Sequence, residues 1–231
     1  MSKSFPFSAI VGQDEMSLAL ILVAIDPSIG GVLVLGDRGT GKSTAVRALA
    51  NVLPSLKVVK GCRYNCEPGY ESGFCDDCLK QISQKKITTK RKLRSETIPV
   101  PVVDLPLGVT EDRVVGSLNM QSALTEGIKK FEPGLLAEAN RGFLYIDEVN
   151  LLEDHLVDLL IDVAASKENI VEREGLSLTH PANFVIVGSG NPEEGDLRPQ
   201  LLDRFGFSVE VTTPTDLNER VEVIKRRQAF D

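Results

Sequence analysis

Residues 31–43 read GVLVLGDRGTGKS, a short apolar run that leads directly into a glycine-rich loop. A wholly apolar segment of this length between glycines is typical of a strand that is buried on both faces of a parallel sheet. Beyond the loop the period changes, because Val46, Leu49 and Leu53 recur at helical spacing. The sequence therefore predicts a buried strand, a tight loop and a helix in immediate succession.

The loop itself matches the phosphate-binding pattern G-x-x-x-x-G-K-[ST] in full. Its glycines allow successive backbone N–H groups to turn toward an anion, and the N-terminus of the following helix adds partial positive charge. We expect Lys42 to reach the β- and γ-phosphates of ATP and Ser43 to ligate Mg²⁺. A chance glycine-rich turn is the alternative, and the flanking strand and helix argue against it. The residues predicted to bind the nucleotide here are Gly36, Asp37, Arg38, Gly39, Thr40, Gly41, Lys42, Ser43 and Thr44.

A second apolar run, residues 143–146, ends in the acidic pair Asp147 and Glu148. Hydrolysis at a phosphate loop needs a metal partner and a group that orients water. We expect Asp147 to hold Mg²⁺, directly or through water, and Glu148 to polarise the attacking water. The alternative is an acidic helix N-terminus, because Asp and Glu are favoured there.

Asn191 follows a third apolar run, residues 184–187, after a short glycine-containing stretch. Because the carboxyl ends of parallel strands lie at one edge of the sheet, we expect Asn191 to lie beside Glu148 and to help to place the water. An ordinary turn asparagine before Pro192 is the alternative.

Two arginines, Arg198 and Arg204, follow in the next segment. An arginine commonly supplies positive charge to a transferring phosphoryl group, and it often comes from a neighbouring subunit. A surface pairing of Arg204 with Asp203 is the plainer interpretation.

Strands that alternate with helices along the 231 residues predict an α/β domain with a parallel central sheet flanked by helices. Residues 170–180 are typical of a hairpin that turns near Glu174 and Gly175. The net charge of -7 and the absence of Trp argue against nucleic-acid binding. No apolar stretch approaches membrane-spanning length, and the N-terminus lacks the pattern of a signal peptide. We therefore expect no membrane insertion and a cytoplasmic or plastid-stromal location.

Residues 60–97 are polar and basic and look inserted into this pattern. Cys62, Cys66, Cys75 and Cys78 follow the spacing C-x₃-C-x₈-C-x₂-C. Two close pairs of this kind can place four thiolates around a tetrahedral Zn²⁺. A reducing compartment disfavours structural disulfides, yet redox-active thiols and inert thiols remain alternatives.

Two further features of the sequence carry less information. The segment from Lys80 to Arg94 holds seven basic residues and no acidic one, which fits a solvated loop or a docking surface for an acidic partner. His155 and His180 are isolated, and no chemistry is assigned to them.

The phosphate loop, the acidic pair, Asn191 and the run LLDRF at residues 201–205 together resemble an AAA+ ATPase. The resemblance narrows to the ATPase (I) subunits of magnesium chelatases, and it covers nearly the whole chain except residues 60–97. The runs that carry it are FPFSAIVGQ at 5–13, VDLPLGVTEDRVVG at 103–116, FEPGLL at 131–136 and GSGNPEEGDLRPQ at 188–200.

The resemblance implies an ATP-driven motor that forms hexameric rings. Such a motor would work with a second AAA+-like subunit and a porphyrin-binding catalytic subunit, and would drive Mg²⁺ insertion into protoporphyrin IX in chlorophyll biosynthesis. Carried over by motif, Val11, Gly12 and Gln13 would flank the adenine, and Arg204 would be an arginine finger acting in trans. AAA+ remodelling ATPases of the MoxR or helicase type, acting on protein or DNA, are the alternative.

The resemblance also implies an organisation for the chain as one AAA+ domain over residues 1–231. It places an insert of the second-helix region at about 104–127 and a hairpin before the sensor strand at about 168–182, both directed at partner subunits. Relatives of this kind continue into a helical lid with a further arginine, whereas the sequence stops at Asp231. We therefore expect a core without the lid, which binds nucleotide but turns over slowly and assembles poorly.

Overall fold

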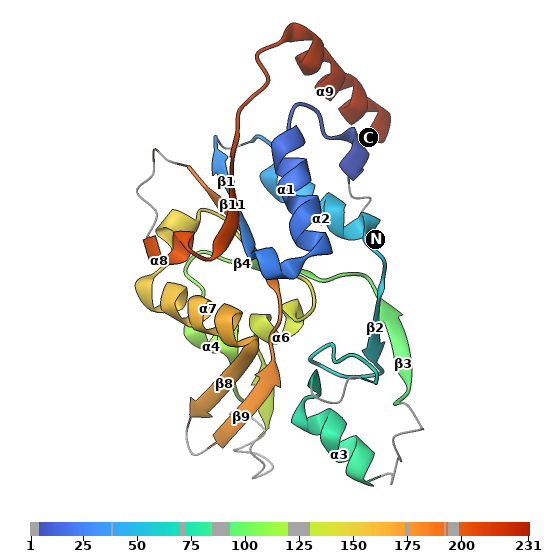
Figure 1. The fold of residues 1–231 in the computed structure, drawn as a ribbon, viewed down its shortest axis with the longest axis vertical. Coiled ribbons are helices and arrows are strands. Elements are labelled where there is room, and N and C mark those ends of the chain that lie inside the picture. The colour runs from blue at the N-terminus through green and yellow to red at the C-terminus, as the bar shows by residue number, and fades with distance from the viewer. Residues whose placement is uncertain are drawn as a thin grey trace.

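Five parallel strands form the central sheet of the protein, in the order β11-β1-β10-β7-β4 (Figure 1). The computed structural model describes residues 5–37, 39–69, 73–84, 93–119, 130–173, 176–191, 193 and 199–231. The strands of the sheet are β1 (Gly31–Gly36), β4 (Val102–Leu105), β7 (Phe143–Ile146), β10 (Val185–Gly190) and β11 (Phe205–Val211). The predicted α/β class with a parallel central sheet is confirmed.

Both faces of the central strands are buried, and alternate residues face opposite layers. In β1, Val32 and Val34 pack in one apolar cluster, while Leu33 packs in the other. In β7, Tyr145 faces the first cluster and Ile146 the second. This alternation explains why the strands read as continuous apolar runs in the sequence.

Helices cover the two faces of the sheet, as Figure 1 shows. The first cluster is closed by α1 (Asp14–Ile25) and α2 (Lys42–Val52), and the second by α4 (Glu111–Val115), α6 (Leu135–Ala139) and α7 (Asp154–Ser166). Other helical elements in the described residues are η1 (Phe7–Ala9), η2 (Pro27–Ile29), η4 (Val149–Leu151), α8 (Pro199–Leu202) and α9 (Leu217–Phe230). In the described part of the chain, no helix is long and apolar enough to cross a membrane.

Two antiparallel pairs lie outside the central sheet on the side of the second cluster. One is the hairpin β8 (Glu168–Arg173) and β9 (Leu176–Pro181), present where the sequence predicted it. The other joins β5 (Gly116–Leu118) to β6 (Phe131–Pro133). Residues 174–175, at the expected turn, and residues 120–127 of the expected insert lie outside the described residues.

The inserted segment has its own small architecture, which the sequence did not predict. β2 (Leu56–Val59) does not join the central sheet but pairs antiparallel with β3 (Ser95–Ile98) in a separate two-stranded sheet. Between them lies α3 (Asp76–Gln84). We name residues 56–98 the cysteine lobe. Its two strands bring the ends of the insertion together, which is why the insertion interrupts the main domain without disturbing the central sheet.

Candidate nucleotide site and cysteine cluster

The phosphate loop lies between the end of β1 and the N-terminus of α2, as the sequence predicted. Gly36 has a φ of 140°, and a Cβ there would clash with the carbonyl oxygen of Val211. Gly39 and Gly41 have φ values of 83° and 86°, and a Cβ on either would meet nothing within 4 Å. These glycines give the left-handed turns that an anion-binding loop requires, and the loop faces open space. Arg38 lies outside the described residues.

The first turn of α2 presents its backbone N–H groups without a side-chain cap or an acidic residue. The Lys42 ammonium donates hydrogen bonds to the carbonyl oxygens of Gly36 and Asp37, the latter at 3.0 Å. The Thr40 hydroxyl donates to Asp37 O at 2.9 Å. A helix N-terminus of positive potential and a lysine folded over the loop form a cradle for phosphate oxygens. Ser43 and Thr44 lie in the first turn of α2.

The carboxylate of Asp147 is held at the end of β7 by two hydroxyl groups. Ser189 Oγ donates to Asp147 Oδ1 at 2.5 Å, and the Tyr145 hydroxyl donates to the same oxygen at 3.1 Å. Burial is the main cause that raises the pKa of Tyr145, so its hydroxyl keeps the proton that it donates. Asp147 itself is exposed to solvent, so this carboxylate is oriented and accessible.

Glu148, the second acidic residue, has a strained backbone. Its φ is 53° and its ψ is 57°, a left-handed conformation that is uncommon for residues other than glycine. Its N–H donates to Ser189 Oγ at 3.3 Å. Strain of this kind is concentrated at functional sites, because the surrounding structure holds the residue in place. The strained backbone of Glu148 therefore favours a residue that takes part in the reaction over an ordinary acidic residue at a helix N-terminus.

Asn191 follows β10 at the same edge of the sheet. Leu35 of β1 pairs with Gly190, and Ile146 of β7 pairs with Gly188. The parallel register therefore brings the ends of β1, β7 and β10 together, with the predicted residues on them. The Asn191 Oδ1 accepts from Glu193 N at 3.1 Å, which is the turn that the plainer interpretation anticipated.

A cavity of about 320 Å³ adjoins the phosphate loop. It is lined by residues of three segments that are distant in the sequence: the N-terminal region, the loop and the C-terminal helix. Its predicted lining residues are Val11, Gln13, Gly39, Thr40, Gly41 and Thr44. Gln13 is anchored, because its Nε2 donates to Thr212 O at 2.9 Å. Gly12, next to it, has a φ of 68° and is exposed.

Arg204 lies at the opposite end of the central strands, where β1 and β11 begin. It directly precedes β11, and its carbonyl oxygen accepts from Gly31 N at 2.9 Å, at the start of β1. The phosphate loop begins at the other end of β1, roughly 16 Å away at the usual rise per residue. The structure therefore does not bring Arg204 to the phosphate loop of its own chain. Arg198 lies outside the described residues.

Sequence reasoning missed several residues that position this site. Ser189 and Tyr145 hold Asp147, and their signal was weak because both lie within apolar strands. Arg47 of α2 donates to both carboxylate oxygens of Asp104 on β4, at 2.9 and 2.7 Å. That ion pair ties the helix that follows the loop to the edge strand. Its partners are 57 residues apart, so no local pattern could have indicated it.

Asn150 is a further residue that sequence reasoning missed. Its side-chain amide atoms are buried and have no hydrogen-bond partner among the described residues. A Cβ built on Gly190 would lie 3.6 Å from Asn150 Oδ1. The side-chain amide of Asn150, which has no hydrogen-bond partner among the described residues, therefore lies next to the end of β10, where Asn191 follows.

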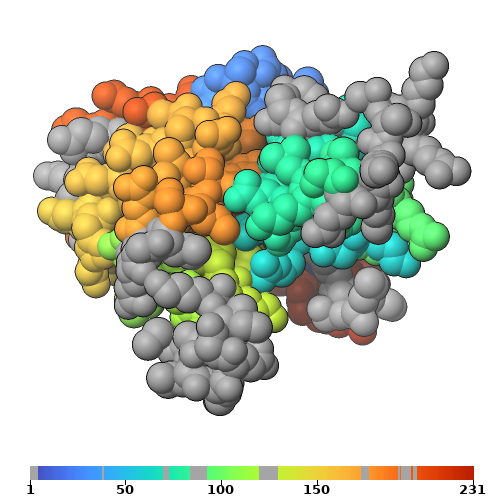
Figure 2. All heavy atoms as spheres, turned by 90° about the horizontal axis from the view of Figure 1, so that it is seen from below, coloured from blue at the N-terminus to red at the C-terminus, as the bar shows by residue number. Residues whose placement is uncertain are grey.

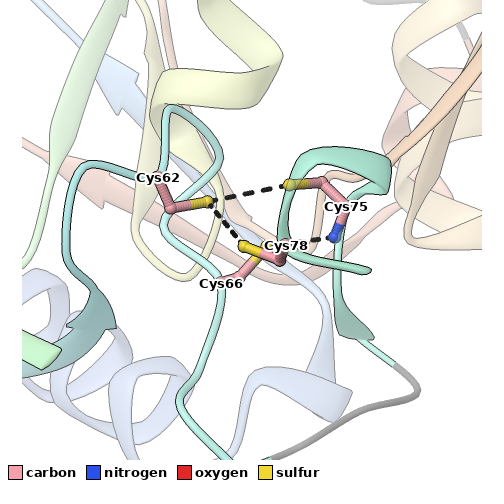
Figure 3. Close-up of side chains that lie close together, drawn as sticks. All are labelled: Cys62, Cys66, Cys75 and Cys78. Atoms are coloured by element: carbon pink, nitrogen blue, oxygen red, sulfur yellow. Dashed lines mark hydrogen bonds between the residues drawn. The ribbon is translucent and has the colours of Figure 1, made fainter. Parts of the chain in front are cut away.

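The four cysteines form a separate cluster in the cysteine lobe (Figure 3). All four Sγ atoms lie within 4.8 Å of one another, and all four thiols are free. Cys66, Cys75 and Cys78 are buried, and Cys62 is partly exposed. None of them is among the described residues that line the cavity at the phosphate loop, so the chain contains two distinct candidate sites.

A parallel sheet of this strand order, with a phosphate loop after β1, an acidic pair after β7 and an asparagine after β10, defines a P-loop ATPase of the AAA+ class. The profile of the family described as "Magnesium chelatase, subunit ChlI" matches residues 117–200. A solved structure of the complex between subunits BchI and BchD of magnesium chelatase matches with a TM-score of 0.78 and 62% identity, over 98% of this chain and 67% of that one. The chain belongs to the ChlI (38 kDa) subunit family of magnesium chelatases.

Curated relatives agree with this assignment. The "Magnesium-chelatase 38 kDa subunit" of Acidiphilium rubrum is 64% identical over 98% of this chain and 64% of its own length. That of Cereibacter sphaeroides is 66% identical over 100% of this chain and 66% of its own length. The "Magnesium-chelatase subunit ChlI, chloroplastic" of Chlamydomonas reinhardtii is 56% identical over 98% of this chain and 53% of its own length. The chain thus spans about two thirds, or less, of the length of these relatives.

Proposed function

We propose that this chain forms the nucleotide-hydrolysing core of a magnesium chelatase motor subunit, which drives Mg²⁺ insertion into protoporphyrin IX. The observation that carries the proposal is the shared edge of β1, β7 and β10, where the phosphate loop, the acidic pair and Asn191 converge. Identities of 62–66% to relatives named as chelatase subunits support the chemistry that this site serves. They do not favour a remodelling ATPase of the MoxR or helicase type.

ATP enters this proposal as the substrate, with its adenine in the cavity lined by Val11 and Gln13 and flanked by Gly12. The backbone N–H groups of the loop and the N-terminus of α2 hold the phosphates, and Lys42 moves from the loop carbonyls to the β- and γ-phosphate oxygens. Burial of the apolar base in this cavity orients the phosphates toward the strand ends.

The two residues of the acidic pair have different roles in the proposed hydrolysis. Ser43 and Asp147 would hold Mg²⁺, which would neutralise negative charge on the phosphates. Glu148 accepts a hydrogen bond from the attacking water and aligns that water with the γ-phosphorus. Asn191 fixes the position of that water with its side-chain amide.

Assembly completes the proposed site. Arg204 lies at the far edge of the sheet from its own phosphate loop, so it would serve the loop of a neighbouring subunit in a homo-oligomeric ring, which we propose to be a hexamer. The second AAA+-like chelatase subunit and the porphyrin-binding catalytic subunit are its proposed partners. The proposed location is the cytoplasm of a photosynthetic bacterium or the chloroplast stroma, and one relative is named as chloroplastic.

The substitution Glu148→Gln tests the proposed chemistry. It preserves the shape of the side chain but removes the charge that polarises water, so ATP binding should stay within about twofold while hydrolysis falls by about 10²–10⁴-fold. Glu153→Gln is the matched control, because Glu153 is an exposed glutamate just beyond the site. Binding is measured with a fluorescent ATP analogue and hydrolysis by phosphate release. Turnover that survives in Glu148→Gln would refute the role of this residue.

A further inference from the structure

We propose that Cys62, Cys66, Cys75 and Cys78 bind one structural Zn²⁺, which holds the cysteine lobe together and fixes it against the β8–β9 hairpin. The site is independent of ATP hydrolysis, because none of the four residues belongs to the nucleotide site. The geometry of the sulfur atoms, the backbone around them and the poor core of the lobe each support the proposal.

The sulfur atoms have the spacing of a mononuclear tetrahedral site. A Zn–S bond of about 2.3 Å in tetrahedral geometry separates neighbouring sulfurs by roughly 3.8 Å. Cys62 Sγ lies 3.8 Å from Cys75 Sγ and 3.6 Å from Cys78 Sγ, and all four Sγ atoms lie within 4.8 Å of one another (Figure 3). A disulfide would require about 2.05 Å. A cluster of several irons would hold its cysteines farther apart than a single ion does.

The backbone around the sulfurs supports thiolates rather than inert thiols. Tyr64 N donates to Cys62 Sγ at 3.4 Å, and Cys75 N donates to Cys66 Sγ at 3.2 Å. Such N–H···S bonds spread the negative charge that four thiolates concentrate around a divalent ion. The turn between the first two cysteines closes through Asn65, whose φ is 49°. The chain therefore turns back on itself so that the two sulfurs face the same point.

The lobe has little else to stabilise it. The buried part of its apolar cluster consists of the three buried cysteines with Val59, Tyr64, Leu93 and Ala137, and Ala137 belongs to the main domain; Phe74 and Ile82 pack against it partly exposed. A two-stranded sheet such as β2–β3 is marginal on its own in water. Small units that cannot build a sufficient core commonly rely on a metal or on disulfides. Because all four thiols are free, a bound metal ion would supply the cross-link that this lobe lacks.

The cluster also determines how the lobe meets the rest of the molecule. Tyr64, between the first two cysteines, packs its ring 4.7 Å from that of His180 in β9, and its carbonyl oxygen accepts from Asn140 Nδ2 at 2.6 Å. Arg63 Nη1 donates to Phe131 O at 3.0 Å. Figure 2 shows the lobe lying directly against the β8–β9 hairpin on this face. Loss of the metal should therefore loosen the hairpin contact as well as the lobe.

Metal content of the wild-type chain is the first test. The protein is purified under reducing conditions without chelator and analysed by inductively coupled plasma mass spectrometry, with an expected content of about one zinc per chain. Less than about a tenth of an equivalent, or iron in place of zinc, would overturn the proposal. Replacement by Co²⁺ should give the intense visible bands of a tetrahedral tetrathiolate site.

Variants and chelation separate a zinc site from a redox pair. Cys75→Ser and Cys78→Ser should lose the zinc, whereas Asp77→Asn, an exposed neighbour of both, should retain it. Should the serine variants fail to fold, removal of zinc from reduced wild-type protein by a chelator should lower Tm by roughly 5 °C. Zinc-free reduced protein that forms a reversible disulfide and keeps its Tm would contradict the proposal.

Nucleotide affinity distinguishes this proposal from the proposed function. Zinc-depleted wild-type protein should bind the fluorescent ATP analogue within about threefold of the untreated protein, because the two sites share no residue. If nucleotide binding is lost in proportion to the zinc removed, the cluster belongs to the nucleotide site. That result would overturn the structural role proposed here.

Discussion

Ser189 connects three parts of the candidate site through one hydroxyl group. Its Oγ donates to Asp147, lies 3.1 Å from the Tyr145 hydroxyl and accepts from the N–H of Glu148. A hydrogen bond to a charged group contributes about 1.5–3 kcal/mol. The residue touches neither the phosphate loop nor the cavity beside it, so we regard it as a positioning residue for the acidic pair.

Replacement of Ser189 by alanine should therefore affect the metal-dependent step. We expect kcat for ATP hydrolysis to fall by about 10- to 100-fold, since each factor of ten corresponds to about 1.4 kcal/mol. The apparent Mg²⁺ requirement should rise, while affinity for ADP without Mg²⁺ should stay unchanged. Steady-state phosphate release over a Mg²⁺ titration measures both, with Ser208→Ala on the exposed face of β11 as control. An unchanged Mg²⁺ dependence would count against the positioning role.

At the scale of elements, the sequence predicted what local patterns determine. The strands β1, β7 and β10 and the helix α2 were predicted because continuous apolar runs, glycines and a change of period mark them. The antiparallel pairing of β2 was not predicted, because the sequence of this strand does not reveal its partner. That partner, β3, is polar and 35 or more residues away in the chain. Arg204 was identified from its motif. Its position at the amino ends of the strands could not be predicted, because it depends on strand register.

His180 in β9 is an element-scale feature with a measurable consequence. The side chain is 1% exposed, and its Nε2 and Nδ1 lie 3.0 Å from Asn169 Nδ2 and Pro181 O. Burial lowers its pKa below the ordinary 6.5. In the unfolded chain His180 therefore takes up a proton near pH 6.5, whereas in the folded hairpin burial disfavours protonation of the ring at that pH. The stability contributed by the neutral ring is present above that pH and lost as the pH falls below it.

We therefore expect the free energy of unfolding to fall as the pH is lowered from 7 to 5. The slope from His180 should reach at most about 1.4 kcal/mol per pH unit. Urea unfolding at several pH values measures it, and His180→Gln should flatten the curve. The other histidine in the chain, His155, is exposed, so His155→Gln should leave the slope as in the wild type. The charged residues lining the adjoining cavity, Glu67, Arg141, Lys167 and Glu168, are the same in both variants. Equal slopes in all three proteins would assign the acid sensitivity to other groups.

At the scale of the whole molecule, the residues of the proposed catalytic site lie at opposite ends of the central strands. The phosphate loop, the acidic pair and Asn191 lie at the carboxyl edge, and Arg204 lies at the amino edge. A single chain cannot bring Arg204 to its own loop without moving β11, which is paired along the whole of β1. Head-to-tail contact between copies brings opposite edges of neighbouring subunits together. This arrangement supports the proposed ring, in which each site would be shared.

Mixing two inactive variants tests this sharing directly. Lys42→Ala should abolish nucleotide binding at its own loop, and Arg204→Ala should leave binding intact but remove the finger offered to the neighbour. In a shared site, an Arg204→Ala subunit next to a Lys42→Ala subunit recovers one complete interface. Random mixing of the two variants in equal amounts, made in the full-length protein, should therefore restore roughly a quarter of full-length wild-type hydrolysis. The assay is phosphate release at a concentration where the subunits assemble, with each variant alone as control. If the mixture stays as inactive as either variant, Arg204 does not act across the interface, and the charge on the transferring phosphoryl group must be met by a residue of the same chain.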